Sequence, residues 1–166
     1  MSQTEEKKHA TASARRSNAE AHGFKNILVP VDFSKTSVEA LPYARDFARK
    51  FGATLILVHV VEKAPFIAGM NTNPMVLSDK EIAERAESEL QRLAQRELQE
   101  MSAKTLVRIG KPFNEINEAA NELKADLIII STHGYTGLKH TLLGSTAERV
   151  IRHAPCAVLV VRKSSS

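Results

Sequence analysis

The chain has 166 residues, of which 43% are hydrophobic and 25% are charged, as in an ordinary globular protein of about one domain. No apolar run approaches the ~20 residues of a membrane-spanning helix, and His59 interrupts the longest run. The single cysteine, Cys156, excludes an internal disulfide framework and a multi-cysteine metal cluster. The first residues lack the apolar region of a secretory signal, so we expect a reduced, cytoplasmic protein with no membrane segment.

The net charge of +4 does not indicate a nucleic-acid-binding protein. A surface that binds nucleic acid concentrates Lys and Arg on one face and adds aromatic side chains that stack on bases. In this chain the basic residues alternate with acidic ones along the predicted helices, and there is no Trp. We therefore do not expect nucleic acid as the main partner.

Along the chain, residues 1–23 are polar and lack an amphipathic period, which predicts a disordered extension. Residues 24–163 form the predicted domain, and residues 164–166 form a short tail. Within the domain, short apolar runs alternate with amphipathic segments. The predicted strands are 26–31, 54–61, 105–109, 127–131 and 157–161, and the predicted helices are 34–51, a long helix from Ser78, a third from Pro112, and 145–153.

This alternation predicts an α/β fold in which an open parallel sheet is covered by helices on both faces. Gly52 is the expected stop signal of the first helix, and the sequence from Ser78 to Glu81 fits a capping box at the start of the long helix. Pro42 lies inside the first predicted helix and should kink it, because proline lacks the backbone donor.

The segment from Leu127 to Ser145 carries the strongest functional pattern. A buried strand is followed by small residues and then by a helix N-terminus, where free backbone N–H groups can bind an anion. The candidate phosphate ligands are the backbone groups of His133, Gly134, Gly144, Ser145 and Thr146. An alternative is purely structural, because Ser145 and Glu148 fit a capping box, in which Ser145 only caps its own helix.

Two further residues lie at strand ends. Asp32 follows the first strand, where ligands of open α/β sheets bind, although it can instead cap the next helix together with Ser34. His59 is expected to be a packed or hydrogen-bonded histidine rather than a base. The chain lacks the sequence patterns of a P-loop, a dinucleotide site and a nucleophile elbow, and its histidines do not complete a metal site.

Together these residues resemble the universal stress protein family. Residues Ser131 to Ser145 are similar to its nucleotide loop, G-x2-G-x9-G-[ST], with Ser131 in place of the first glycine. The resemblance extends over residues 25–163, through VPVDFS at Val29, LVHV at Leu57, GKP at Gly110 and the last helix and strand. If the first position of the loop needs a positive φ, Ser131 is strained there and affinity falls.

The resemblance implies a Rossmann-like sheet of five strands in the order 3-2-1-4-5, and a homodimer paired through Val158, Leu159, Val160 and Val161. It also implies an ATP site, with or without Mg²⁺, in which Asp32 and the backbone of Val60 face the adenosine. Gly134, Gly144, Ser145 and Thr146 would hold the phosphates, and Gly110 would line the site. The full expected set is Pro30, Asp32, Val60, Gly110, Ser131, His133, Gly134, Gly144, Ser145 and Thr146.

Three functions remain open on the sequence. The first is an ATP-binding regulator of the stress response with slow or no hydrolysis, because His133 is the sole, weak candidate for a base near the loop. The second is a dimerisation and docking module that binds no nucleotide, motivated by Ser131 and the capping alternative. The third is a weak ATPase.

Overall fold

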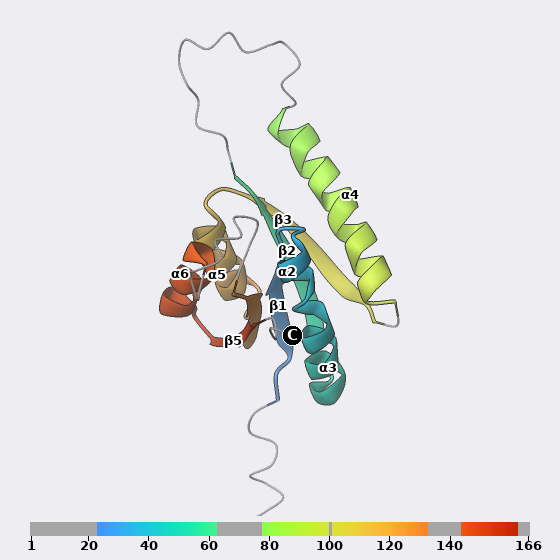
Figure 1. The fold of residues 1–166 in the computed structure, drawn as a ribbon, viewed down its shortest axis with the longest axis vertical. Helices are drawn as coiled ribbons and strands as arrows, with labels where there is room; N and C mark the ends of the chain where they lie inside the picture. The colour runs from blue at the N-terminus through green and yellow to red at the C-terminus, as the bar shows by residue number, and fades with distance from the viewer. Residues whose placement is uncertain (1–22, 63–77, 100, 133–143, 163–166) are drawn as a thin grey trace, which may run out of the picture.

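Five parallel strands form one sheet in the computed structural model, which describes residues 23–62, 78–99, 101–132 and 144–162. The sheet has the order β3-β2-β1-β4-β5, which confirms the order that the family resemblance implies (Figure 1). All strand pairs are parallel, and consecutive strands are separated by helices in the chain, as parallel pairing requires. The strands are β1 (Asn26–Pro30), β2 (Thr54–Val61), β3 (Ala103–Ile109), β4 (Leu127–Ser131) and β5 (Ala157–Val161).

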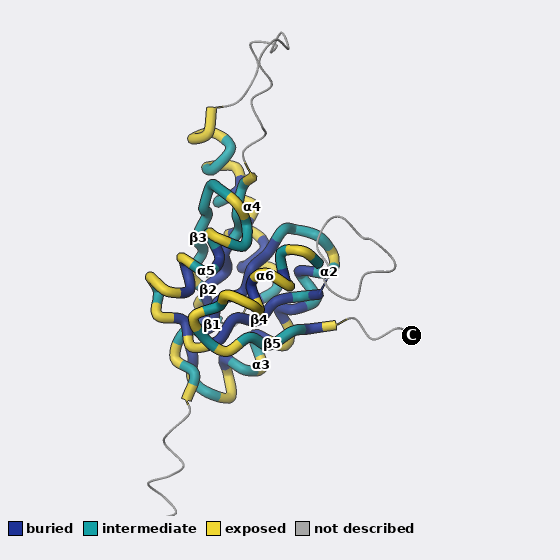
Figure 2. Tube along the Cα trace, turned by 90° about the vertical axis from the view of Figure 1, so that its left-hand side faces the viewer, coloured by how far each residue is buried: buried dark blue, intermediate teal, exposed yellow. Residues whose placement is uncertain are grey.

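The helices cover both faces of this sheet. Figure 1 shows α3 and α4 on one side of the strands and α5 and α6 on the other. Such a three-layer arrangement buries the central strands on both faces, and the tube in Figure 2 is accordingly dark blue along much of β1, β2 and β4. The helices are α2 (Lys35–Val38), α3 (Leu41–Phe51), α4 (Asp79–Glu97), α5 (Pro112–Glu122) and α6 (Ser145–His153).

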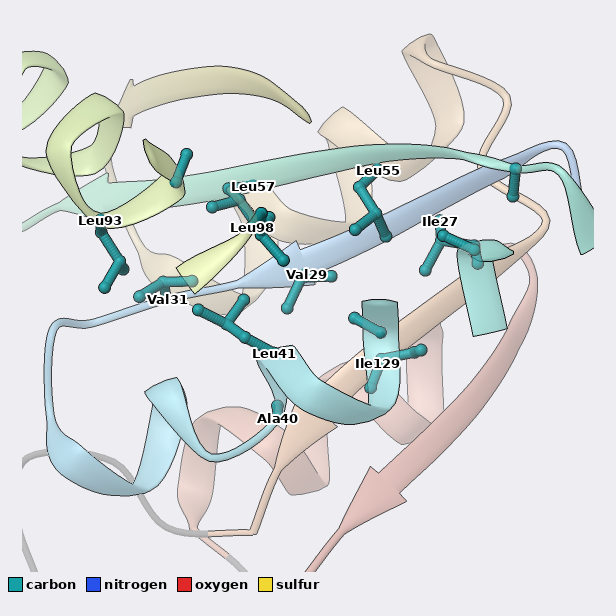
Figure 3. Packing of buried hydrophobic residues seen from close by; sticks show 14 of the residues in the cluster. Ile27, Val29, Val31, Ala40, Leu41, Leu55, Leu57, Leu93, Leu98 and Ile129 are labelled. Carbon is teal, nitrogen blue, oxygen red and sulfur yellow. The ribbon is translucent and has the colours of Figure 1, made fainter. Parts of the chain in front are cut away.

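Alternating side chains of the strands form two separate cores, because successive residues of a strand point to opposite faces. In β1, Ile27 and Val29 pack with Leu41 of α3 and Leu90 of α4, and Figure 3 shows part of this cluster. Leu28, between them in sequence, packs on the opposite face with residues of α5 and α6. The apolar runs noted in the sequence are therefore strands buried on both sides.

The predicted helix boundaries are confirmed at two places by specific caps. Ser78 is the N-cap of α4: its Oγ accepts the backbone N–H of Glu81 at 3.3 Å, and the Glu81 carboxylate accepts the backbone N–H of Ser78 at 2.8 Å. The hydrogen bonds that this carboxylate accepts, first from the Ser78 backbone N–H and then from the Ser78 hydroxyl, lower the pKa of the exposed Glu81 carboxyl. Gly52 ends α3 with φ 65°, a left-handed conformation that glycine adopts without strain.

The single predicted helix over 34–51 is wrong, because two helices occupy this range. Ser34 caps the short α2, and α3 begins separately at Leu41. Pro42 therefore lies in the first turn of a helix, where its missing N–H has no partner to lose, and it produces no kink. Strand β3 also begins at Ala103, two residues earlier than predicted. The predicted extension covers residues 1–23, of which residues 1–22 lie outside the described residues.

Candidate functional site

A crevice forms where β1 and β4 diverge. These two strands pair at only two register positions, Ile27 with Leu127 and Leu28 with Ile128. Their amino ends are tied together because Asp126 Oδ2 accepts the backbone N–H groups of Lys25 at 2.7 Å and Asn26 at 2.9 Å. From β1, the chain adds β2 and β3 on one side of the sheet and then β4 and β5 on the other side of β1. Ligands of open α/β sheets bind at the carboxyl ends of the two strands at such a switch point.

A cavity of about 750 Å³ lies at these carboxyl ends. Seven of the ten residues expected from the sequence line it, from segments far apart in the chain: Pro30, Asp32, Val60, Ser131, Gly144, Ser145 and Thr146. Gly110 lies beside the cavity rather than in its lining, and its backbone N–H donates to Val61 O at 3.0 Å. His133 and Gly134 lie outside the described residues.

The N-terminus of α6 forms one wall of this cavity. Its N-cap is Gly144 rather than Ser145, so the alternative in which Ser145 and Glu148 form a capping box is wrong. Among the residues that the structure describes, no side chain makes a capping hydrogen bond to this helix. Gly144 N–H is engaged at 2.6 Å with Thr132 O, which fixes the start of the helix against the end of β4. The positive end of the helix dipole therefore adjoins the cavity.

Ser131, which replaces the first glycine of the family pattern, is the last residue of β4. It pairs in register with Val161 and lines the cavity. In the described ranges, the residues other than glycine with positive φ are Phe33 and Lys124. Ser131 therefore has an ordinary backbone conformation, and the strain considered from the sequence is absent at this residue.

Asp32 combines a structural contact with a place on the cavity. Its Oδ1 accepts the backbone N–H of Ser34 at 3.0 Å and also the Ser34 hydroxyl. Ser34, rather than Asp32, is the N-cap of α2, and its side chain accepts from Ser37 N–H. Asp32 thus orients the cap residue and also belongs to the cavity lining.

His59 is hydrogen-bonded, as expected, and it also belongs to the cavity lining. Its Nδ1 lies 2.8 Å from Val31 O, and its ring centroid lies 4.4 Å from that of Phe33. Phe33 has φ 61°, an unusual conformation for a bulky residue, of the kind that clusters at ligand sites. A positive φ is usually predicted from a glycine, and because position 33 is a phenylalanine, the sequence does not indicate this conformation.

Helix α4 adds charged residues that sequence reasoning missed. Arg85 and Glu89, one turn apart, line the cavity from α4, and Glu62 lines it from the end of β2. A smaller adjoining hollow of about 290 Å³ shares Ser145 and Thr146 with it and adds two cations, Lys111 and Arg149. In the sequence, these residues are recognisable only as charged side chains. Their common position depends on how α4, α5 and α6 sit over the sheet, which the sequence does not specify.

The remaining chemistry-bearing groups do not extend the site. In the described ranges, no cluster of three His, Cys, Asp or Glu side chains can hold a metal ion. None of the helices described there has the length and apolarity that crossing a bilayer requires. Cys156 is half-buried, and burial, followed by the charge of Asp126, raises the pKa of its thiol, which lowers its reactivity.

Comparison with known proteins assigns the chain to a family. A sequence model described as the universal stress protein family matches residues 23–162. The chain belongs to the universal stress protein family. A curated member, universal stress protein MJ0531 of Methanocaldococcus jannaschii, is 39% identical over 142 residues, which cover 84% of this chain and 83% of that protein.

Solved structures of the family share the fold. MJ0577 of Methanocaldococcus jannaschii superposes with a TM-score of 0.70 at 28% identity, covering 87% of this chain and 100% of that one. The universal stress protein UspA of Lactobacillus plantarum superposes with a TM-score of 0.68 at 29% identity, covering 85% and 99%. This universal stress protein therefore has the α/β architecture of its family.

Proposed function

We propose that this universal stress protein binds ATP in the cavity between β1 and β4 and acts as a nucleotide-dependent regulator. The observation that carries the proposal is the convergence of seven expected residues, from four separate segments of the chain, on one cavity. Its volume of about 750 Å³ is in the range of small-molecule and cofactor sites.

The charges of the cavity suit a nucleotide lying in one direction. The N-terminus of α6 supplies the backbone N–H groups of Ser145 and Thr146 and a positive dipole for the phosphates, while Gly144, whose own N–H donates to Thr132 O, lines the same wall. Two cationic residues, Lys111 and Arg149, and one acidic residue, Glu62, line the adjoining hollow, so its net charge next to this wall is positive. We assign the adenosine to Asp32 and the backbone of Val60, which line the same cavity and carry acceptor groups.

Two solved family members show that this fold can hold adenine nucleotides, because one is a complex with cAMP and another, from Archaeoglobus fulgidus, is a complex with dAMP. Their identities to this chain are 23% and 22%, so the likeness to them supports the shared fold alone. The preference for ATP in this chain is therefore a matter for direct measurement.

We further propose that hydrolysis is slow or negligible. The sequence contains no P-loop lysine, and His133 remains the one candidate base that the sequence offers near the loop. Binding rather than turnover then carries the signal. The dissociation constant should be measured with and without Mg²⁺, because the phosphates themselves can bring the ion.

The test begins with protein purified without added nucleotide, which is denatured so that any released ligand can be identified by chromatography and mass. Titration with ATP follows, monitored by thermal unfolding. A ligand at a hundredfold excess over its dissociation constant adds about 2.7 kcal/mol to the free energy of unfolding. A protein that releases no nucleotide and shows no shift with ATP would contradict the proposal and favour the docking module.

Gly144→Val locates the site. Gly144 has φ −67° and ψ 149°, which any residue adopts, so valine introduces bulk without backbone strain. We expect loss of ATP binding with an unchanged oligomeric state. Gly23→Val makes the same chemical change outside the cavity, where an added Cβ meets nothing within 4 Å, and should bind as the parent does. Equal ATP affinity in both variants would show that α6 does not bind the phosphates.

We also propose a homodimer in which two copies of β5 pair. This strand is at the edge of the sheet, and Val158, Leu159 and Val160 are only half-buried there. An apolar edge strand is an aggregation hazard unless another strand covers it. Light scattering at several concentrations should give twice the monomer mass, and a monomer at all of them would contradict this part of the proposal.

A further inference from the structure

His59 has a fixed hydrogen-bonding polarity. Its Nδ1 lies 2.8 Å from the carbonyl oxygen of Val31, and a carbonyl oxygen can only accept. Nδ1 must therefore carry the proton. In the neutral ring, Nε2 then has a lone pair and no hydrogen, so it can accept a hydrogen bond but cannot donate one.

The surroundings hold this ring in place at the mouth of the site. Val31 N–H donates to Val58 O at 2.8 Å, which locks β1 and β2 together beside the histidine. The Phe33 ring packs on the imidazole at 4.4 Å with an interplanar angle of 39°. A half-buried ring held by a hydrogen bond on one nitrogen and an aromatic contact on its face has little rotational freedom. The ring is thus preorganised while still lining the cavity.

Asp32, another residue of the cavity lining, is also a hydrogen-bond acceptor. His59 lies directly before Val60 in β2, and Asp32 lines the same cavity. A carboxylate accepts hydrogen bonds and does not donate them. The neutral His59 ring and the Asp32 carboxylate are thus two acceptors among the residues that line the cavity, and they favour a ligand that offers N–H or O–H groups.

We propose that His59 Nε2 accepts a hydrogen bond from the nucleoside and makes the site select for a donor at that position. The proposal rests on the proposed function, because it names the partner of the bound nucleotide within the same cavity. The donor is an N–H or O–H group of adenosine, either the 6-amino group of the base or a ribose hydroxyl. His59 is in this view a specificity-determining residue, with Phe33 as the residue that positions it.

Two substitutions separate the two nitrogens. His59→Asn places an amide near the position of Nδ1, so it can keep the bond to Val31 O while removing Nε2. His59→Gln places an amide near Nε2 and gives up the bond to Val31 O. We expect His59→Asn to keep the melting temperature of the free protein and to weaken ATP binding by about 3- to 10-fold, the effect of one hydrogen bond. We expect His59→Gln to lower the melting temperature of the free protein and to keep ATP binding close to that of the parent.

Analogues of ATP identify the donor by a thermodynamic cycle. The ligands are ATP, purine riboside triphosphate, which lacks the amino group, and the 2′-deoxy and 3′-deoxy forms of ATP. The analogue that lacks the donor should bind the parent more weakly than ATP does, and His59→Asn should weaken it no further. Equal affinity of the parent and His59→Asn for ATP would overturn the proposal, as would an equal loss for every analogue. A parent that binds none of these nucleotides would refute the proposed function itself, and this proposal with it.

Discussion

The left-handed backbone of Phe33 allows a sharp test of the local structure. At φ 61°, a side chain with a Cβ raises the energy by about 1–2 kcal/mol, whereas glycine has no such penalty. Phe33→Ala and Phe33→Gly both remove the ring from His59, so they lose the same packing. They differ in the Cβ, which is strained in alanine and absent in glycine. The greater freedom of glycine in the unfolded chain offsets part of this gain, by about 0.4–1 kcal/mol.

We therefore expect Phe33→Gly to be more stable than Phe33→Ala by about 1 kcal/mol. With a urea m-value of about 1–3 kcal/mol per M, the two unfolding midpoints should differ by roughly 0.3–1 M. The same pair of substitutions at Glu118, which is exposed in α5, provides the control. Because glycine disfavours a helix, Glu118→Gly should be less stable than Glu118→Ala by about 1 kcal/mol. The reasoning is refuted if Phe33→Gly unfolds at the same urea concentration as Phe33→Ala, or at a lower one.

Two further predictions concern α4. Leu90 is fully buried in the core between α4 and the sheet, so Leu90→Ala should lower the free energy of unfolding by about 2–5 kcal/mol, whereas Ser88→Ala on the exposed side of this helix should change it by less than about 0.5. Urea titration of both variants checks this, and equal midpoints would show that Leu90 does not anchor the helix. The Glu81 pKa is lowered in the folded protein, so its contribution to stability is present above its unfolded pKa and is lost as the pH falls through the folded value. The stability advantage of the parent over Glu81→Gln should therefore shrink on acidification, and a gap that stays constant from neutral pH to below pH 4 (roughly the unfolded pKa) would exclude this linkage.

The sequence predicts the sheet and most of the cavity because both depend on short-range patterns. Continuous apolar runs mark strands buried on two faces, and small residues at their ends mark where a ligand can approach. Seven cavity residues follow from these strand ends and from the family resemblance. The break between α2 and α3 was missed because Pro42 is compatible both with a kinked helix and with a first turn, and local pattern does not distinguish the two.

Long-range placement explains the other omissions. Arg85 and Glu89 line the cavity because α4 packs over the carboxyl end of β2, and this depends on tertiary contacts rather than on their own neighbours in sequence. The N-cap of α6 was assigned to Ser145 in one reading because the capping-box pattern matches there. The contact of Gly144 N–H with Thr132 O instead starts the helix one residue earlier. This hydrogen bond joins the start of α6 to the end of β4, and the capping-box pattern of the sequence does not include it.

The brief pairing of β1 with β4 has a mechanical consequence. The sheet consists of two halves, β3-β2-β1 and β4-β5, which share a seam of two register positions and a clasp made by Asp126 at its amino end. The opposite end of the seam is the cavity, where Asp32 belongs to one half and Ser145 to the other. A molecule that touches both residues would close the open end as Asp126 closes the other. Amide hydrogen exchange at Leu28 and Ile128, which pair in the seam, would then slow on binding. The stability of the pairing between β1 and β4 would thereby couple ligand binding to the outer strand β5.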